Sequence, residues 1–177
     1  MTNLKQLTWE EHKNAERQAF VKELMGGISV QRYCDFLHNL HPQYNILENF
    51  SKLHNLLDIE VAKNIHADIL ELEQQLVDYK PVIYPVVKEY TDHLLTIKDD
   101  PHKLMAHIYV RHMGDLSGGQ MIAKRIPGSA KFYQFDEDVN VLKDKIRTRL
   151  EDSMADEAKI CFNFATELFK QMAVSNN

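Results

Sequence analysis

The hydrophobic residues of this chain recur mostly at intervals of three and four positions, the spacing of an α-helix that buries one face. Thr8 and Glu11 have the spacing of a capping box, so we predict a helix that begins at Thr8. That helix should run to about Met25, because the Gly26-Gly27 pair favours a helix end.

The same period continues along the rest of the chain. Ser29 is placed to cap a second helix, which we expect to bend or restart at Pro42. Asp100 as cap and Pro101 in the first turn begin a helix that should reach about Lys124. The remaining predicted segments are helices over Ile65–Val77 and Val86–Leu95, a loop over Ile126–Asp138, and a last helix over Val139–Met172 with a kink near Ser153.

Composition narrows the class of protein. The chain has 177 residues, of which 44% are hydrophobic, and it holds only six glycines and five prolines. We therefore predict one all-α domain over residues 1–177, a bundle of six to eight helices. The net charge of -5 argues against a fold-wide nucleic-acid footprint.

The two cysteines, Cys34 and Cys161, are too few for a disulfide scaffold and suit a reducing compartment. We interpret both as small buried hydrophobic residues. No apolar run approaches the roughly 20 residues that cross a bilayer, and the N-terminus lacks signal character. We therefore expect a cytoplasmic protein without a membrane anchor.

A glycine-rich stretch in one predicted helix is the most informative part of the sequence. Gly114, Gly118 and Gly119 each cost a helix about 1 kcal/mol relative to alanine, so some compensating role is expected. Gly114 and Gly118 would share a face without side chains, bordered by Asp115. Arg111 lies one turn before Asp115. Close helix packing and a flat ligand against bare backbone are both compatible with this pattern.

The run from Gly114 to Gln120, Gly-Asp-Leu-Ser-Gly-Gly-Gln, closely resembles the signature of the haem oxygenases. Tyr109 and Arg111 lie upstream in register, and Met113 stands where the family usually has leucine. Weaker resemblance extends over most of the chain, although the segment after Gln120 looks shorter than in most relatives. The resemblance implies a single-domain helical bundle with haem between a proximal N-terminal helix and a glycine-kinked distal helix.

The family uses a neutral histidine near the N-terminus as its iron ligand, and nine histidines are available here. His12 lies in a segment similar to the proximal helix, so the resemblance implies that it binds the iron. Glu16, one turn later, would face His12 and accept its other ring proton. His112 is interpreted as a packing or surface residue. His38 and His41 could form a metal pair, but no paired Glu-x-x-His motifs support a di-iron bundle.

The two haem propionates need cationic partners. By resemblance, Lys5, Lys143 and Arg147 would bind them, with the hydroxyl of Tyr109 assisting. The alternative for each cation is a solvated surface charge. Phe162 falls where the family has an aromatic ring against the haem, and a plain core position in the last helix is an equal alternative.

The resemblance implies a haem oxygenase that opens haem to biliverdin, the IX-alpha isomer, with release of carbon monoxide and ferrous iron. Haem would serve as substrate and cofactor, with O2 and an external electron donor, ferredoxin, as partners of a monomer. Gly114 and Gly118 would leave room for ordered water at the reacting oxygen. Asp115 would anchor that water and deliver protons, with Arg111 tuning the network.

Two alternatives remain at this point. The first is a non-catalytic haem carrier, store or sensor with the same fold, against which the intact Asp115 argues. The second is a helical bundle of the thiaminase-like type without haem.

Overall fold

Helices form the regular structure of residues 2–175, the part of the chain that the computed structural model describes, and these residues contain no β-strand. The all-α prediction is therefore confirmed. In chain order the elements are α1 (Leu4–Leu7), α2 (Trp9–Glu16), α3 (Ala19–Met25), α4 (Val30–Leu53), α5 (Ala62–Glu73), α6 (Pro85–Thr96), α7 (Pro101–Leu116), α8 (Gly119–Ile122), the 3₁₀ helix η1 (Lys131–Tyr133), α9 (Val139–Arg147), the 3₁₀ helix η2 (Asp152–Met154) and α10 (Ala155–Ser175).

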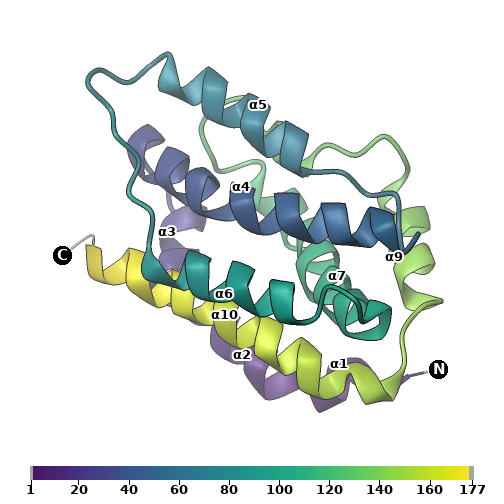
Figure 1. The fold of residues 1–177 in the computed structure, drawn as a ribbon. Helices are drawn as coiled ribbons and strands as arrows, with labels where there is room; N and C mark the ends of the chain where they lie inside the picture. The colour runs from purple at the N-terminus through teal and green to yellow at the C-terminus, as the bar shows by residue number, and fades with distance from the viewer. Residues whose placement is uncertain (1, 176–177) are drawn as a thin grey trace.

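The two longest helices, α4 and α10, organise the packing (Figure 1). α4 contacts α5, α6 and α7, and α10 contacts α2, α3, α6 and α7. α4 continues through Pro42, although this proline cannot donate to the carbonyl of His38. The buried apolar side chains of α4 are Tyr33, Cys34, Phe36, Leu37, Leu40, Tyr44 and Leu47. Their burial holds the helix continuous where we expected a bend or restart.

Two of the predicted caps are confirmed. The hydroxyl of Ser29 accepts a hydrogen bond from the backbone N–H of Arg32 at 3.2 Å, at the start of α4. The carboxylate of Asp100 accepts from the N–H of Lys103 at 3.1 Å, and Pro101 opens α7. Both side chains satisfy N–H groups that the helix itself leaves without partners.

The first predicted helix is wrong in detail, because it is divided. α2 ends at Glu16, and Gln18 has extended backbone angles, φ -65° and ψ 143°, before α3. The predicted capping box does not form, since the hydroxyl of Thr8 donates to the carbonyl of Leu4 at 2.9 Å. Thr8 thereby joins α1 to α2 instead of capping α2.

The glycine-rich helix is also shorter than predicted. α7 ends at Leu116, and Ser117, with φ -99° and ψ -85°, separates it from α8. Of the three glycines only Gly114 lies inside α7, while Gly118 and Gly119 lie at the start of α8. The last predicted helix is likewise divided into α9, η2 and α10, so the expected kink near Ser153 is a complete break.

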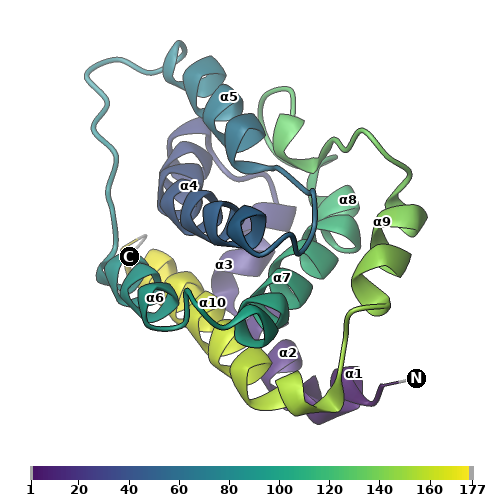
Figure 2. The same cartoon turned by 45° about the vertical axis from the view of Figure 1, so that its right-hand side comes forward.

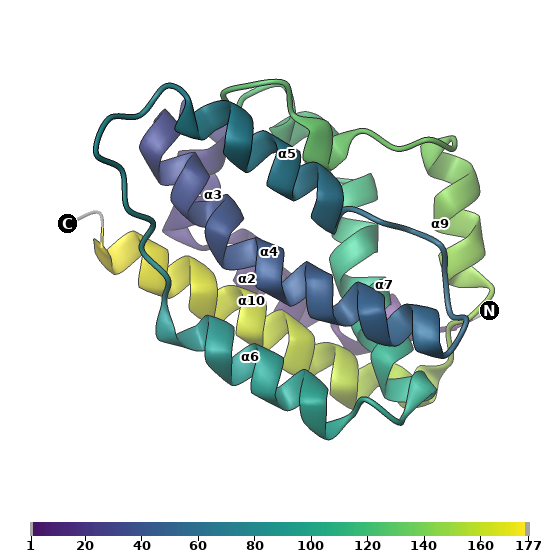
Figure 3. The ribbon, with the colours of Figure 1, turned by 45° about the horizontal axis from the view of Figure 1, so that its top comes forward.

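The ends of the described chain lie far apart. α1 contacts η2, the element that follows α9, and the end of α10 lies on the opposite side of the molecule (Figures 1 and 3). None of the helices formed by residues 2–175 is both long enough and apolar enough to cross a membrane.

Candidate active site

His12 lies on α2 between three side chains. Its Nε2 is 2.8 Å from Oε1 of Glu16, which the helix places one turn later. The ring of Phe162 on α10 stacks on the imidazole, with centroids 5.3 Å apart, and the ring of Trp9 contacts it edge-on at 5.5 Å. The His12 side chain is 32% exposed. An imidazole with a fixed plane, a carboxylate partner and access from outside is a competent metal ligand.

The nitrogen of His12 that contacts Glu16 is Nε2. A metal bound at Nε2 therefore requires the ring to turn, so that Nδ1 faces Glu16 instead. The side chain of Glu16 is 62% exposed, so its carboxylate has room to follow this movement of the ring.

The glycines at the end of α7 have different surroundings. A Cβ placed on Gly114 would meet no atom within 4 Å, and one on Gly118 would meet only the carbonyl oxygen of Gly114, at 3.8 Å. A Cβ on Gly119 would lie 2.6 Å from the ring of Tyr133. Close packing therefore explains Gly119, but it does not explain Gly114 and Gly118. Those two form an uncovered strip of backbone, which we call the glycine strip.

Asp115 points into the protein beside the glycine strip and is 8% exposed. The hydroxyl of Tyr44, on α4, lies 2.8 Å from Oδ2 and 3.0 Å from Oδ1 of this carboxylate. Burial raises the pKa of Asp115 to about 7, against the opposing effects of the Tyr44 hydrogen bond and the positive charge of Arg111. Asp115 can thus take up and release a proton near neutral pH.

Arg111 is buried one turn before Asp115, but its hydrogen bond goes elsewhere. Nη2 donates to Oε1 of Gln43 at 2.5 Å, and the guanidinium lies 4.5 Å from the centroid of the Tyr90 ring. Arg111 therefore acts on Asp115 through its charge. Of the two alternatives for His112, packing and surface, the structure shows the first: it is 2% exposed, and burial together with the charge of Arg111 lowers its pKa to about 4.

Tyr109 is buried on α7, and the side chain of Thr8 is its hydrogen-bond partner. This contact ties α7 to the segment between α1 and α2. Burial raises the pKa of Tyr109, so its hydroxyl keeps its proton and can act as a donor.

The three predicted cations belong to helices at one end of the molecule. Lys5 is on α1, and Lys143 and Arg147 are on α9; both helices lie on the same side of the molecule (Figure 2). Lys5 is exposed, with Nζ 5.9 Å from the centroid of the Trp9 ring. Arg147 is also exposed and its Nη1 lies 3.0 Å from Asp144. Arg147 therefore already has an anionic partner.

Tyr44 and Gln43 were not predicted as site residues. A signal for them exists in the sequence, because Gln43 interrupts the apolar face that Leu40, Tyr44 and Leu47 form on α4. Buried polar side chains within such a face need partners. The pattern does not say that those partners are Arg111 and Asp115, which lie far away along the chain.

The two halves of the site share one support, because α2 and α7 both pack against α10 (Figure 2). An accessible imidazole on α2 and an uncovered backbone strip on α7 fit an iron ligand and a surface for a flat ring. The residues present are therefore compatible with haem, the group that the sequence resemblance implies.

Comparisons with known proteins agree with this geometry. The family model described as Heme oxygenase matches residues 1–171. A heme oxygenase of Rhodella violacea is 29% identical over 202 residues, covering 96% of this chain and 85% of that protein. Heme oxygenase 2 of Synechocystis sp. is 31% identical over 191 residues, covering 90% and 75%.

Solved structures give the same result. The structure of the heme oxygenase from Leptospira interrogans has a TM-score of 0.82 and 26% identity, covering 95% of this chain and 97% of that one. Heme oxygenase-2 from Synechocystis sp., in complex with heme and NO, has a TM-score of 0.80 and 25% identity, covering 96% and 83%. With its signature residues on the strip described above, the chain belongs to the haem oxygenase family.

Proposed function

We propose that this protein binds haem between α2 and α7 and opens it to biliverdin IX-alpha, with release of carbon monoxide and ferrous iron. The observation that carries the proposal is the glycine strip, which is uncovered and borders a buried acid with a pKa of about 7. When bound, haem supplies the iron that takes up O2 and the ring carbon that is oxidised.

His12 is the residue that would hold the haem iron. Once the ring has turned as described above, Glu16 would accept a hydrogen bond from Nδ1–H and so select the tautomer in which Nε2 is free to bind the metal. Phe162 fixes the plane of the ring through the stacked contact. A neutral imidazole here would give a bound haem iron less electron density than a thiolate ligand would.

The glycine strip and Asp115 would control access and protons at the bound ring. Gly114 and Gly118 would let the backbone approach a flat ring and would leave space for ordered water. Asp115 would hold that water and move protons through its carboxylate oxygens, while the Tyr44 hydroxyl fixes the carboxylate in place. Arg111 makes deprotonation of Asp115 easier through its charge.

Lys5, Lys143 and Arg147 are the proposed partners of the propionates, with Tyr109 as a further donor. Arg147 would exchange its contact with Asp144 for a propionate. Ferredoxin as the electron donor, a cytoplasmic location and a monomeric state are further proposals that rest on the sequence resemblance.

The decisive experiment measures haem affinity and biliverdin yield side by side, during aerobic incubation with haem and a reductant. We expect the wild-type protein to produce biliverdin. Asp115→Asn should retain haem binding and lose most of the product, whereas Asp92→Asn, an exposed control on α6, should match the wild type. A wild-type protein that binds haem without forming pigment would contradict the proposal and favour a haem carrier.

A further inference from the structure

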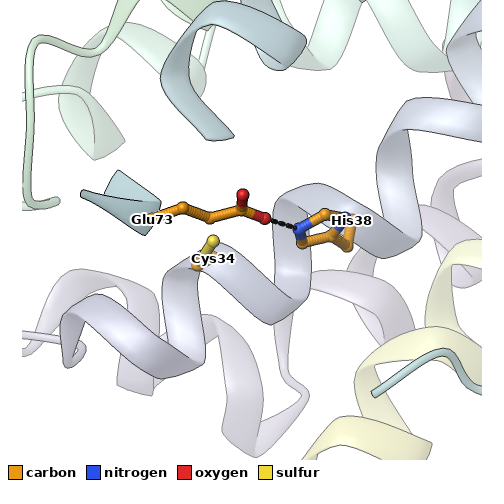
Figure 4. Close-up of side chains that lie close together, drawn as sticks. All are labelled: Cys34, His38 and Glu73. Carbon is orange, nitrogen blue, oxygen red and sulfur yellow. Dashed lines mark hydrogen bonds and ion pairs between the residues drawn. The ribbon is translucent and has the colours of Figure 1, made fainter. Parts of the chain in front are cut away.

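A second group of metal-ligand side chains lies at the contact between α4 and α5 (Figure 4). It shares no residue with the haem site, although α4 also carries Tyr44, the partner of Asp115. Cys34 and His38 come from successive turns of α4, and Glu73 is the last residue of α5. One ligand atom from each of the three lies within 4.8 Å of the others. Nε2 of His38 and Oε1 of Glu73 are 2.6 Å apart.

The three side chains differ in access. Cys34 is fully buried, while the His38 and Glu73 side chains are 22% and 36% exposed. The sulfur is therefore shielded from bulk solvent, while the imidazole and the carboxylate border it.

Two negative charges act on the thiol. The carboxylates of Glu73 and Asp35 both interact with Cys34 through their charge, and Glu73 is itself one of the three clustered side chains. A divalent cation would neutralise these charges and displace the thiol proton, because metals bind cysteine as thiolate.

Tyr79 supplies the outer contacts that metal ligands usually have. Its hydroxyl donates to Oδ1 of Asp35 at 2.5 Å, and its ring centroid is 6.0 Å from that of His38. The same hydroxyl interacts with the sulfur of Cys34. Such partners orient ligands and tune their basicity.

We propose that Cys34, His38 and Glu73 form a binding site for a divalent transition-metal ion, with Zn²⁺ as the preferred occupant. One sulfur, one nitrogen and one oxygen donor suit zinc, and three protein ligands leave a fourth position for water. The thiolate disfavours Mg²⁺ and Ca²⁺, which take oxygen ligands. Tetrahedral ligation needs about 3.3 Å between nitrogen and oxygen, given bonds of about 2.0 Å, so Glu73 must move slightly away from His38.

A rival cluster in the described residues, His93, His107 and Glu157, is less suitable. Its two histidines both bind Oε1 of Glu157, at 2.5 and 2.8 Å, and Tyr90 occupies the other nitrogen of His107. Burial opposes ionisation of Glu157, yet the hydrogen bonds from His107 and His93 lower its pKa to about 2. Both nitrogen contacts of His107 are thus taken up within the protein, and the thiol of Cys161, which also interacts with His107, is buried. This cluster provides a control.

The experiment titrates the full, haem-free chain with Co²⁺, which reports thiolate coordination through a sulfur-to-metal charge-transfer band, and then displaces it with Zn²⁺. Cys34→Ser should abolish the band. His38→Asn and Glu73→Gln should weaken Co²⁺ binding by more than about 100-fold, beyond the 10–100-fold loss typical of outer contacts. Tyr79→Phe should weaken it by about tenfold.

Far-UV circular dichroism and haem uptake show whether each variant is folded. His93→Asn should leave the band and the affinity unchanged. A band that survives Cys34→Ser, or Co²⁺ binding that is unaffected in folded His38→Asn, would overturn the proposal. Binding that is lost only in His93→Asn would assign the metal to the rival cluster and overturn it equally.

Discussion

Asp115 carries a carboxyl group into the protein interior, where its protonation depends on a few neighbours. Burial favours the neutral acid, and the Tyr44 hydroxyl and the Arg111 charge favour the anion. The balance places the pKa of Asp115 at about 7, well above its ordinary value of 3.8. The same residue therefore affects both proton transfer and the free energy of unfolding.

Between about pH 4 and pH 7 the folded protein binds the Asp115 proton more tightly than the unfolded chain does. The contribution of this proton to the free energy of unfolding is fully present below about pH 4. It is lost as the pH rises to 7, by at most about 1.4 kcal/mol per pH unit. Asp115→Asn should therefore gain stability relative to the wild type between pH 4 and pH 8. Urea unfolding of the haem-free proteins tests this, and parallel pH profiles would contradict it.

His12→Ala removes the proposed iron ligand and leaves a cavity between Phe162 and Trp9. We expect an altered haem spectrum and loss of turnover. Added imidazole should fill the cavity and restore part of both. The exposed His102, which pairs with Glu151, gives the control variant His102→Ala. An unchanged haem spectrum in His12→Ala would rule out the ligand assignment.

At the scale of single residues the sequence indicates His12, Glu16 and Asp115 as site residues, because a signature motif and helical spacing are local properties of the chain. It does not point to Tyr44 as the partner of Asp115. That contact joins α4 to α7 and depends on how the two helices pack, which no local pattern specifies.

At the scale of elements, the end of α7 shows how a tertiary contact overrides a helical pattern. Gly119 packs against Tyr133 of η1, and the chain turns at Ser117 to make this approach. The caps at Ser29 and Asp100 are predictable because cap and N–H group lie three residues apart. The break at Ser117 cannot be predicted in the same way, because the contact that accounts for it is with Tyr133 in another element.

The two kinds of glycine should respond in opposite ways to substitution. Gly114→Leu adds a side chain in open space and a better helix former, so stability should rise by up to about 1 kcal/mol while biliverdin formation falls. Gly119→Ala drives a methyl group into the Tyr133 ring and should cost about 1–3 kcal/mol. Thermal unfolding with a turnover assay separates the two effects. Full activity in Gly114→Leu would refute close approach of a ligand.

At the scale of the whole molecule, the fold gathers segments from distant parts of the sequence. α1 and α9, far apart in the sequence, lie on the same side of the molecule and carry the three proposed propionate partners, Lys5, Lys143 and Arg147 (Figure 2). The helical class and the single bundle follow from composition and period. The division into α9, η2 and α10 depends on packing against α7 and could not be read from the period.

Lys143→Ala combined with Arg147→Ala tests the proposed propionate contacts. A charge-assisted hydrogen bond contributes about 1.5–3 kcal/mol, and exposure should reduce this, so we expect roughly tenfold weaker haem binding. The biliverdin should become a mixture of isomers, because the ring can rotate in its plane. Lys88→Ala, an exposed lysine on α6, serves as control. Unchanged affinity and a single isomer would leave both residues as surface charges.

The stacking of His12 on Phe162 also has a consequence for how the protein is made. A ribosome releases α2 long before α10, the helix against which α2 packs. Until α10 has emerged, α2 has neither its support nor the ring that fixes the imidazole. A nascent chain therefore cannot assemble the complete haem site before α10 has emerged, and loading with haem must wait until then.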